Sequence, residues 1–425
     1  MLEPGILADQ VTTEPRPPVI AGRVAAAAAW ESRRYDIFDG LRGLVVLVVI
    51  SHYTDSVAWS GWAALAILAE TALAAVALDV FFVMSGFLIT GILLDSKGSS
   101  SYFRAFYGRR FLRIFPLYYG FLAVYFIVLP TLWPDTFAGL ALRPGQHAFY
   151  WLYGVNIAYG LDWTLGANTG HLWSLAVEEQ FYLVWPAVVA LCGRRALLRV
   201  CVACLIVAPM AKLVLVQLMP HTLAFHTFTI ARIDGLALGA LLACAVRTPD
   251  SLLRLRRWVR PVVWSALGIA AGAIAIELSN SQHVIGLHVP MFLIASVYLA
   301  GAVVAWSLYA APGSRWQAAF TVAPLRRIGL YSYGIYVLHD PLVYVVERLG
   351  WLASPGQNAT VLDVLVYSAL MIPLTIAVGA ISWHAWESRW LRLKRYLPYE
   401  AAASARPNLG RVAALGQPPS PTGQQ

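Results

Sequence analysis

The strongest constraint on this chain is a series of long apolar segments that recurs along most of its 425 residues. A helix needs about 20 mostly apolar residues to cross the hydrocarbon core of a bilayer. Ten segments meet or approach this length: 37–56, 71–94, 111–130, 173–192, 199–219, 229–246, 261–278, 288–309, 328–346 and 361–385. Charged residues make up only 12% of the chain, whereas soluble domains carry about 25%. The sequence therefore predicts an all-α integral membrane protein, built as a bundle of about ten transmembrane helices.

The positions of the basic residues predict how this bundle is oriented. Lys and Arg concentrate in the cytoplasmic loops of membrane proteins. With ten spans and a cytoplasmic N-terminus, 26 of the 31 basic residues fall in cytoplasmic segments, and only Arg143 and Arg348 fall in outer loops. The apolar stretch 146–158 fits an interfacial or re-entrant segment, because an eleventh span there would move the clusters at 194–199 and 247–260 outside. We therefore expect a multi-pass protein of the cytoplasmic (inner) membrane with both termini in the cytoplasm.

The polar ends of the chain differ from the rest. Residues 1–35 and 397–425 are rich in Pro, Ala, Gly and Gln, which predicts disordered cytoplasmic tails on a membrane domain of residues 36–396. The net charge of +9 does not indicate nucleic-acid binding, because the basic residues form short clusters between apolar runs. Cys201 and Cys204 form a CxxC without a second Cys or His pair, which favours helix packing over a metal or redox site.

Charged residues inside spans cost about 2.5–3.5 kcal/mol each on insertion scales, and they usually face the protein interior. The first such group is Asp39-Gly-Leu-Arg42-Gly, with His52 farther along the same span. At about 1.5 Å per residue, His52 lies roughly 15 Å outward from Arg42. A neutral imidazole at that depth suits a general base that takes a proton from a hydroxyl. The alternative is a buried histidine that only bonds a neighbouring helix.

The second group lies in the second span, where Asp79 precedes Phe81-Phe-Val-Met-Ser85-Gly86-Phe87. Ser and Gly in an apolar helix commonly allow close helix packing. The segment lacks the flanking glycines of a nucleophile elbow. Packing is therefore the favoured interpretation of Ser85 and Gly86, ahead of a role in a site.

The third group is a cluster of arginines at the cytoplasmic start of the third span. Arg109 and Arg113 are four residues apart, and Arg110 and Arg113 are three apart, so their guanidiniums can converge on one helix face. Converging arginines suit phosphate groups, which they bind bidentately. The alternative is charge that sets topology next to anionic lipid.

The fourth group is the segment His171-Leu-Trp173-Ser174-Leu-Ala-Val-Glu178-Glu179, which leads into the fourth span. Two adjacent carboxylates entering a membrane helix do not fit a solvated surface. We expect one to pair with an Arg or His and the other to face an outer cavity. The sixth and ninth spans add further buried polar groups, namely Arg232, Asp234, Ser332, Tyr333, Tyr336 and His339.

Taken together, these motifs resemble the acyltransferase-3 family of membrane acyltransferases, of the O-antigen and exopolysaccharide O-acetylase type. The matching strings follow the order of that family: FDGLRGL…H at 38–52, FFVMSGFLI at 81–89, RRFLRIFPLYY at 109–119, HLWSLAVEEQFYLVWP at 171–186, RIDGLALG at 232–239 and SYGIYVLH at 332–339. Each string is weak alone, but six in register are specific.

The resemblance implies a ten-helix domain that moves an acyl group, expected to be acetyl, from cytoplasmic acyl-CoA to a hydroxyl of an extracytoplasmic glycan or glycoconjugate. Acyl-CoA enters as a donor substrate, so we expect no bound cofactor and no metal. His52 would be the general base, in a catalytic site with Arg42, Asp39 and Glu179. The expected donor-binding residues are Arg109, Arg110, Arg113 and Tyr118. The other expected site-lining residues are Ser85, Trp173, Ser174, Glu178, Arg232, Asp234, Ser332, Tyr333, Tyr336 and His339.

One spacing departs from the pattern of the family. Nine residues separate Arg42 from His52, where the family usually has ten. Because a helix turns by about 100° per residue, eleven steps return to the same face, whereas ten leave the two side chains roughly 80° apart. A local irregularity such as a π-bulge, or a different orientation of Arg42, would account for the departure.

The competing class is a transporter or flippase for a glycan precursor, in which buried charge would line a translocation path. The chain shows no convincing internal repeat of the kind that many transporters carry, and the arginine cluster lies on the donor side. A structural membrane protein would not need six polar motifs inside lipid. The sequence therefore favours an O-acyltransferase with membrane lipid, acyl-CoA and a glycan acceptor as partners, and with no nucleic acid.

Overall fold

The computed structural model describes residues 36–51, 62–163, 165–247, 249–279, 286–309, 313–355 and 360–399. Within these ranges the regular structure is entirely helical, without strands, which confirms the predicted all-α class. His52, residues 1–35 and residues 400–425 lie outside the described residues, so the predictions for them stay predictions.

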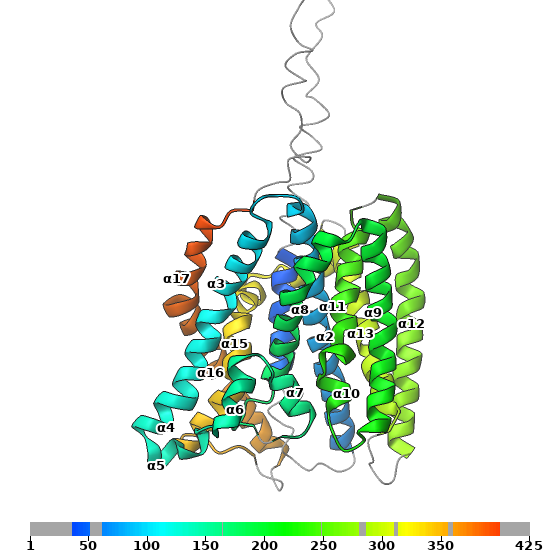
Figure 1. The fold of residues 1–425 in the computed structure, drawn as a ribbon. Helices are drawn as coiled ribbons and strands as arrows, with labels where there is room; N and C mark the ends of the chain where they lie inside the picture. Colours follow the sequence, from blue (N-terminus) through cyan, green and yellow to red (C-terminus); the bar gives the residue numbers. More distant parts are fainter. Residues whose placement is uncertain are drawn as a thin grey trace, which may run out of the picture.

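The described residues form ten long helices, which stand side by side in one bundle (Figure 1). Each overlaps one of the ten predicted spans. They are a helix over residues 36–50, called the first helix below, and α2 (Trp62–Ser96), α3 (Tyr102–Ala123), α8 (Leu172–Leu191), α9 (Arg194–Leu218), α11 (Thr229–Ala245), α12 (Pro249–Ser279), α13 (His288–Tyr309), α15 (Ala323–Arg348) and α16 (Val361–Ser382).

Shorter elements extend or connect these helices. Two of them are π-helical, η1 after α3 and η3 after α16. The shorter elements are η1 (Val124–Val128), α4 (Leu129–Leu132), α5 (Pro134–Phe137), η2 (Ala138–Leu140), α6 (Pro144–Trp151), α7 (Val155–Gly160), α10 (Ala224–Thr227), α14 (Arg315–Phe320), η3 (Trp383–Glu387), α17 (Ser388–Arg392) and η4 (Leu393–Tyr396). The predicted interfacial stretch 146–158 is thus divided between α6 and α7, with a break between them.

Seven helical stretches of the described residues are long and apolar enough to cross a membrane: Ala72–Ser96, Tyr102–Leu132, Arg194–Leu218, Ala224–Ala245, Arg257–Ile276, His288–Tyr309 and Leu362–Tyr396. The other three long helices are the first helix, α8 and α15. The first helix is short, and the other two contain several polar and charged residues, including the Glu178–Glu179 pair in α8. The chain is therefore a multi-pass membrane protein by these seven helices.

The two ends of the bundle differ in charge and in structure (Figure 1). The end of α2 and the starts of α3, α9 and α12 lie at the top of the figure, and α4 to α7 and α10 lie towards the bottom. Arg109 and Arg110 in α3 and Arg194 and Arg195 in α9 belong to the upper half. We call the two ends the arginine end and the short-helix end.

Glycines bring three pairs of helices into backbone contact. A Cβ atom on Gly86 of α2 would lie 1.9 Å from the carbonyl oxygen of Leu236 in α11. A Cβ on Gly40 of the first helix would lie 1.7 Å from the carbonyl oxygen of Phe320 at the end of α14, and one on Gly329 of α15 would lie 1.8 Å from that of Asp39 in the first helix. None of these contacts has room for a methyl group, which confirms the packing interpretation of Gly86.

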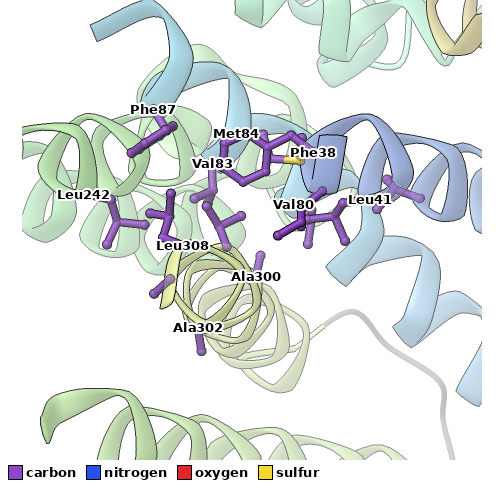
Figure 2. Close-up of a cluster of buried hydrophobic side chains, with 14 of the residues drawn as sticks. Phe38, Leu41, Val80, Val83, Met84, Phe87, Leu242, Ala300, Ala302 and Leu308 are labelled. Atoms are coloured by element: carbon purple, nitrogen blue, oxygen red, sulfur yellow. The ribbon is translucent and has the colours of Figure 1, made fainter. Parts of the chain in front are cut away.

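Apolar side chains fill the space around these crossings. Figure 2 shows side chains from the first helix, α2, α11 and α13 that pack into one cluster. Phe38 meets Phe87 edge to face, with ring centroids 5.6 Å apart, and Val83 and Ala300 are fully buried. This cluster fixes the first helix against α2, and so fixes the register of the polar residues that both helices carry.

Candidate functional site

A central cavity of about 130 Å³ lies among the first helix, α2, α3, α8 and α15. Nine predicted site residues from five separate helices line it, and they are Arg42, Ser85, Arg110, Arg113, Ser174, Glu178, Ser332, Tyr333 and Tyr336. Tyr182 and a set of apolar residues complete the lining, and these are Leu78, Phe81, Phe82, Met84, Leu88, Ile89, Ile114 and Leu175. The motifs that are separate in sequence therefore meet at one place.

Two of the three clustered arginines of α3 reach this cavity. The Arg110 guanidinium lies over the Tyr182 ring, 5.1 Å from its centroid. That of Arg113 lies 5.8 Å from the Tyr333 centroid and 5.6 Å from the Trp383 centroid. A guanidinium over an aromatic face is attracted to the ring but keeps its N–H groups free for other partners. Within the described residues, neither arginine forms an ion pair with a carboxylate.

Arg109 is placed differently from its two neighbours. It donates hydrogen bonds to the carbonyl oxygens of Lys394 at 3.1 Å and Leu397 at 3.0 Å. Its guanidinium also lies over the ring of Tyr399, 4.9 Å from the centroid. The helix periodicity allowed all three arginines on one face, but Arg109 instead attaches the chain after η4 to α3.

A hydrogen-bonded chain crosses one wall of the cavity. The Ser85 hydroxyl bonds to the Tyr182 hydroxyl, which in turn donates to Oε2 of Glu178 at 3.0 Å. Ser85 therefore faces the cavity, so the packing interpretation favoured for it from the sequence is wrong, while its neighbour Gly86 serves the packing of α2 against α11. Tyr182 was not selected from the sequence as a site residue, although its position four residues after Glu178 places both on one face of α8.

The other walls are held by hydrogen bonds to the backbone. Tyr333 donates to the carbonyl oxygen of Ile114 at 2.7 Å, which ties α15 to α3. Tyr336 donates to the carbonyl oxygen of His171 at 2.9 Å and also bonds to the Ser174 hydroxyl. These contacts fix α15 at the start of α8.

Arg42 and Asp39 lie at the first helix. Arg42 lines the cavity, and its Nη1 is 3.4 Å from Oδ1 of Asp39, one helical turn earlier. Asp36 on the same helix pairs with Arg326 of α15 at 2.5 Å. His52 lies outside the described residues, so its position relative to Arg42 stays a prediction.

Arg232, Asp234 and Trp173 lie behind the cavity wall, which differs from the prediction that they line the site. The Arg232 guanidinium pairs with Asp79 and lies over the rings of Phe82 and Trp173, 5.2 and 5.6 Å from their centroids. Asp234 pairs with Lys212. The physical reason is that these charges neutralise one another across α2, α9 and α11, and paired charges are stable inside a bundle.

The remaining predicted residues lie around the cavity and do not line it. The Tyr118 hydroxyl donates to the carbonyl oxygen of Tyr150 at 2.9 Å, and its ring stacks on Tyr153. Oε1 of Glu179 is buried and has no hydrogen-bond partner within the described residues. The His339 ring lies 4.6 Å from that of His171, towards the short-helix end.

Glu387 is a further buried charge that the sequence reasoning missed. It lies in η3, is 3% exposed, and accepts a hydrogen bond from Ser382 at 3.1 Å. It fits against α15 because Gly334 has no side chain there: a Cβ would lie 2.8 Å from Glu387 Oε1. Trp383, one turn earlier, is one of the rings beneath Arg113. Glu387 was not selected from the sequence because it follows the predicted span 361–385 and was therefore grouped with the cytoplasmic charges.

The described residues hold no group of three or more His, Cys, Asp or Glu side chains that suits a metal ion. The site instead combines hydroxyls, one carboxylate and three arginines around a space between membrane helices, and two of these arginines, Arg110 and Arg113, form no ion pair within the described residues. Such an arrangement suits an organic anion held next to a polar group that undergoes reaction.

Comparison with known proteins gives the class of the chain. The family model Acyl_transf_3, described as an acyltransferase domain, matches residues 35–383. The chain therefore belongs to the acyltransferase-3 family, and the resemblance of its motifs is confirmed.

Individual relatives agree with this assignment. Peptidoglycan O-acetyltransferase OatA of Listeria monocytogenes serovar 1/2a is 29% identical over 351 residues, which cover 78% of this chain and 53% of that protein. Putative peptidoglycan O-acetyltransferase YrhL of Bacillus subtilis is 25% identical over 77% of this chain and 51% of its own length. O-acetyltransferase OatA of Staphylococcus aureus is 25% identical over 73% of this chain and 50% of its own length. The chain spans about half the length of these relatives. No solved structure matches it.

Proposed function

We propose that this chain is an O-acyltransferase of the cytoplasmic membrane. It transfers an acyl group, with acetyl as the expected case, from cytoplasmic acyl-CoA to a hydroxyl of an extracytoplasmic glycan or glycoconjugate. The single observation that carries this proposal is the pair Arg110 and Arg113, which face the central cavity from α3 without a carboxylate partner within the described residues.

These two arginines suit the phosphates of the donor. Arg113 lies eleven residues after the start of α3, which is roughly 16 Å along the helix axis from the arginine end. Phosphate oxygens bound there would leave the thioester end of the donor to extend into the cavity. The guanidiniums are already oriented by Tyr182, Tyr333 and Trp383, so binding would cost little side-chain entropy.

The chemical step needs a base and a leaving group. The acceptor hydroxyl attacks the thioester carbonyl carbon while His52 takes the hydroxyl proton. The carbon–sulfur bond then breaks, the ester forms on the acceptor, and the CoA thiolate leaves with the proton from His52. Arg42 and the pair of Tyr182 and Glu178 border the space in which this carbonyl would lie.

The proposed topology places donor and acceptor on opposite sides. Ten spans with both termini cytoplasmic would put the arginine end inside and the short-helix end outside. The first helix, α8 and α15 would complete the seven apolar spans, since polar residues in a span are tolerated where they face the protein interior. A reporter fused after Gly98 should then be cytoplasmic, and one fused after Gly166 should be external.

Replacement of His52 tests the proposal directly. His52→Ala should abolish acylation of the product while the protein remains folded and inserted, because no other base is assigned to the hydroxyl. The matched control is His221→Ala, at an exposed position between α9 and α10. Full acylation by His52→Ala would refute the base assignment.

The acceptor can be found from the glycans of the cell envelope. Two relatives are named for O-acetylation of peptidoglycan, so a wall glycan is the first acceptor to test. Mass spectra of envelope glycans from cells with and without this protein should differ by the mass of the acyl group. A flippase, the second candidate, would instead change the amount of exported glycan and leave its ester content as it was.

A further inference from the structure

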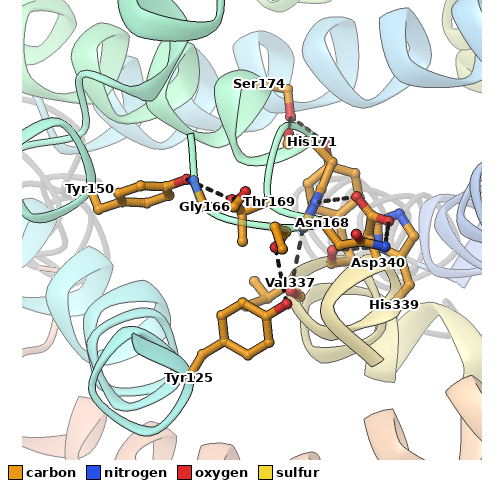
Figure 3. Close-up of polar contacts among 12 residues, drawn as sticks. Tyr125, Tyr150, Gly166, Asn168, Thr169, His171, Ser174, Val337, His339 and Asp340 are labelled. Atoms are coloured by element: carbon orange, nitrogen blue, oxygen red, sulfur yellow. Dashed lines mark hydrogen bonds and ion pairs between the residues drawn. The ribbon is translucent and has the colours of Figure 1, made fainter. Parts of the chain in front are cut away.

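Four polar side chains gather at the short-helix end of α8 and α15, just beyond the central cavity (Figure 3). Asp340 lies at the centre of this histidine cluster, which consists of Asn168, His171, His339 and Asp340. Its Oδ2 is 3.4 Å from Nδ1 of His171, and its Oδ1 accepts a hydrogen bond from Asn168 at 3.2 Å. The ring of His339 lies 4.6 Å from the ring of His171.

Hydrogen bonds with Tyr150 and Tyr125 hold the loop that carries Asn168 in place. Its backbone N–H at Gly166 donates to the Tyr150 hydroxyl at 2.9 Å, and Tyr150 bonds to Thr169 at 2.6 Å. Tyr125 donates to the carbonyl oxygen of Ala167 at 3.0 Å. Asn168 itself has a φ of 48°, a left-handed conformation that Asn tolerates better than most residues. The loop therefore presents the Asn168 amide to Asp340 in one fixed orientation.

Hydrogen bonds join the cluster to residues that line the cavity. Nδ1 of His339 lies 2.7 Å from the carbonyl oxygen of Tyr336, and the Tyr336 hydroxyl bonds both to the backbone of His171 and to Ser174. Tyr336 and Ser174 line the cavity. A ligand bound at the cluster would therefore lie one helical turn from the site where the acyl group is proposed to react.

The exposure and chemistry of the cluster suit a sugar. The side chain of Asp340 is 35% exposed, while that of His171 is 10% exposed and its Nδ1 has only the 3.4 Å contact with Asp340. A carboxylate accepts hydrogen bonds from hydroxyls, an amide both donates and accepts, and each imidazole can do either. The cluster contains no Lys or Arg, so it offers no charge for a phosphate. Vicinal hydroxyls are the ligand that such a set can satisfy.

We propose that the histidine cluster is the acceptor subsite, which binds a sugar and directs one of its hydroxyls towards the central cavity. This inference rests on the proposed function and adds the position and ligand class of the acceptor. The residues act by binding and orientation, and His52 remains the proposed base.

The test uses the full chain in lipid nanodiscs, which expose both faces. Radiolabelled acetyl-CoA serves as donor and a soluble tetrasaccharide of N-acetylglucosamine and N-acetylmuramic acid as acceptor, and each concentration is varied in turn. Asp340→Asn keeps the shape but removes the charge, and Asn168→Gly removes the amide without straining the backbone. The matched control is Asp135→Asn, at an exposed carboxylate of α5 at the same end of the bundle.

We expect Asp340→Asn to raise the KM for the tetrasaccharide by about tenfold, and Asn168→Gly to raise it several-fold. The kcat should stay within about twofold, and the KM for acetyl-CoA should not change, as in the Asp135→Asn control. A purely structural role would instead lower kcat together with the amount of folded protein and would leave the acceptor KM unchanged. That result would overturn the proposal.

Other outcomes separate this inference from the proposed function. Acetyl transfer by the wild-type chain to lipid, with none to the tetrasaccharide, would overturn the sugar assignment while the enzyme remained an acyltransferase. A raised KM for acetyl-CoA alone in Asp340→Asn would move the cluster to the donor side. No transfer from acetyl-CoA to any acceptor by the wild-type chain would refute the proposed function itself.

Discussion

Two sets of charged residues lie inside this bundle, and they differ in whether they form ion pairs. In the first set, Arg232 pairs with Asp79 and Lys212 pairs with Asp234, and all four side chains are at most 3% exposed. In the second set, Arg110 and Arg113 lie on aromatic rings at the central cavity, and no described carboxylate pairs with them.

The difference indicates which charges stabilise the fold and which are available to a ligand. A buried charge is costly unless a partner of opposite sign and hydrogen bonds compensate for it. The paired set meets this condition, and Ser296 adds a hydrogen bond to Asp79 at 2.5 Å. The cavity set depends on ring contacts, which orient a guanidinium without neutralising it. Glu178, Glu179 and Glu387 lie near these guanidiniums without forming ion pairs with them, so the N–H groups remain available to an anionic ligand.

Breaking the paired set should produce the largest effect on stability. Lys212→Met leaves Asp234 buried without its cation, so we expect a loss of about 3–5 kcal/mol in the free energy of unfolding. Thermal unfolding in detergent would measure this loss. The double variant Lys212→Met/Asp234→Leu removes both charges and should recover most of the stability. A double variant no more stable than the single one would contradict the pairing.

Breaking the cavity set should instead affect donor binding. Arg110→Gln together with Arg113→Gln should weaken acyl-CoA binding more than tenfold, since a hydrogen bond to a charged group contributes about 1.5–3 kcal/mol. Stability should change by less than about 1 kcal/mol. Equilibrium binding of labelled acetyl-CoA is the measurement, and Arg109→Gln on the same helix is the control. Unchanged affinity in the double variant would return these arginines to a topological role.

A smaller effect is expected from Tyr182, which lines the central cavity. Tyr182→Phe removes the hydroxyl that joins Ser85 to Glu178, which should cost about 1–3 kcal/mol in transition-state stabilisation. The ratio kcat/KM for acetyl transfer would show this cost as a loss of roughly five- to hundredfold. Tyr107→Phe, on an exposed tyrosine of α3 that bonds to Leu183, should have no comparable effect. Equal activity of Tyr182→Phe and wild type would show that the hydrogen bonds from Ser85 through Tyr182 to Glu178 play no part in the reaction.

Glu387 belongs to neither set of charges. It is buried near Arg113 but forms no ion pair with it. Glu387→Gln keeps the hydrogen bond from Ser382 but removes the charge. We expect a several-fold change in the KM for acetyl-CoA, on the order of 1 kcal/mol, with kcat nearly unchanged. Glu387→Asp should restore part of the difference. A fall in kcat alone would show that Glu387 does not act through donor binding.

The helices and the convergence of the site were predictable because both follow from local rules. Apolar length predicts a membrane helix, and polar residues within such a helix turn inward. Arg42, Arg110, Glu178 and Tyr336 come from four different helices, yet each was selected from its own segment. Their meeting at one cavity is the result of that shared rule. Ser85 was not selected in this way, because its segment favoured packing and only the family resemblance pointed to a site.

The partner of each charge could not be predicted from local rules. Asp79 and Arg232 are 153 residues apart, and only the crossing of α2 and α11 brings them together. For the same reason, one sequence does not distinguish Arg109, which bonds to the chain near residue 397, from Arg113, which reaches the cavity. Helix α8 also falls outside the seven apolar stretches, since the polar residues that build the site lower its hydropathy.

The close contact of Gly40 with the end of α14 has a consequence for genetics. Gly40 and Arg42 stand two positions apart, and a substitution at either should abolish function for unrelated reasons. A larger residue at Gly40 would meet the backbone at Phe320 and force the first helix away from α14, whereas a change at Arg42 would alter a cavity between helices that remain in contact. A screen for lost acylation would therefore recover both alleles with one phenotype. Only the amount of protein in the membrane would separate the alleles that lose assembly from those that lose chemistry.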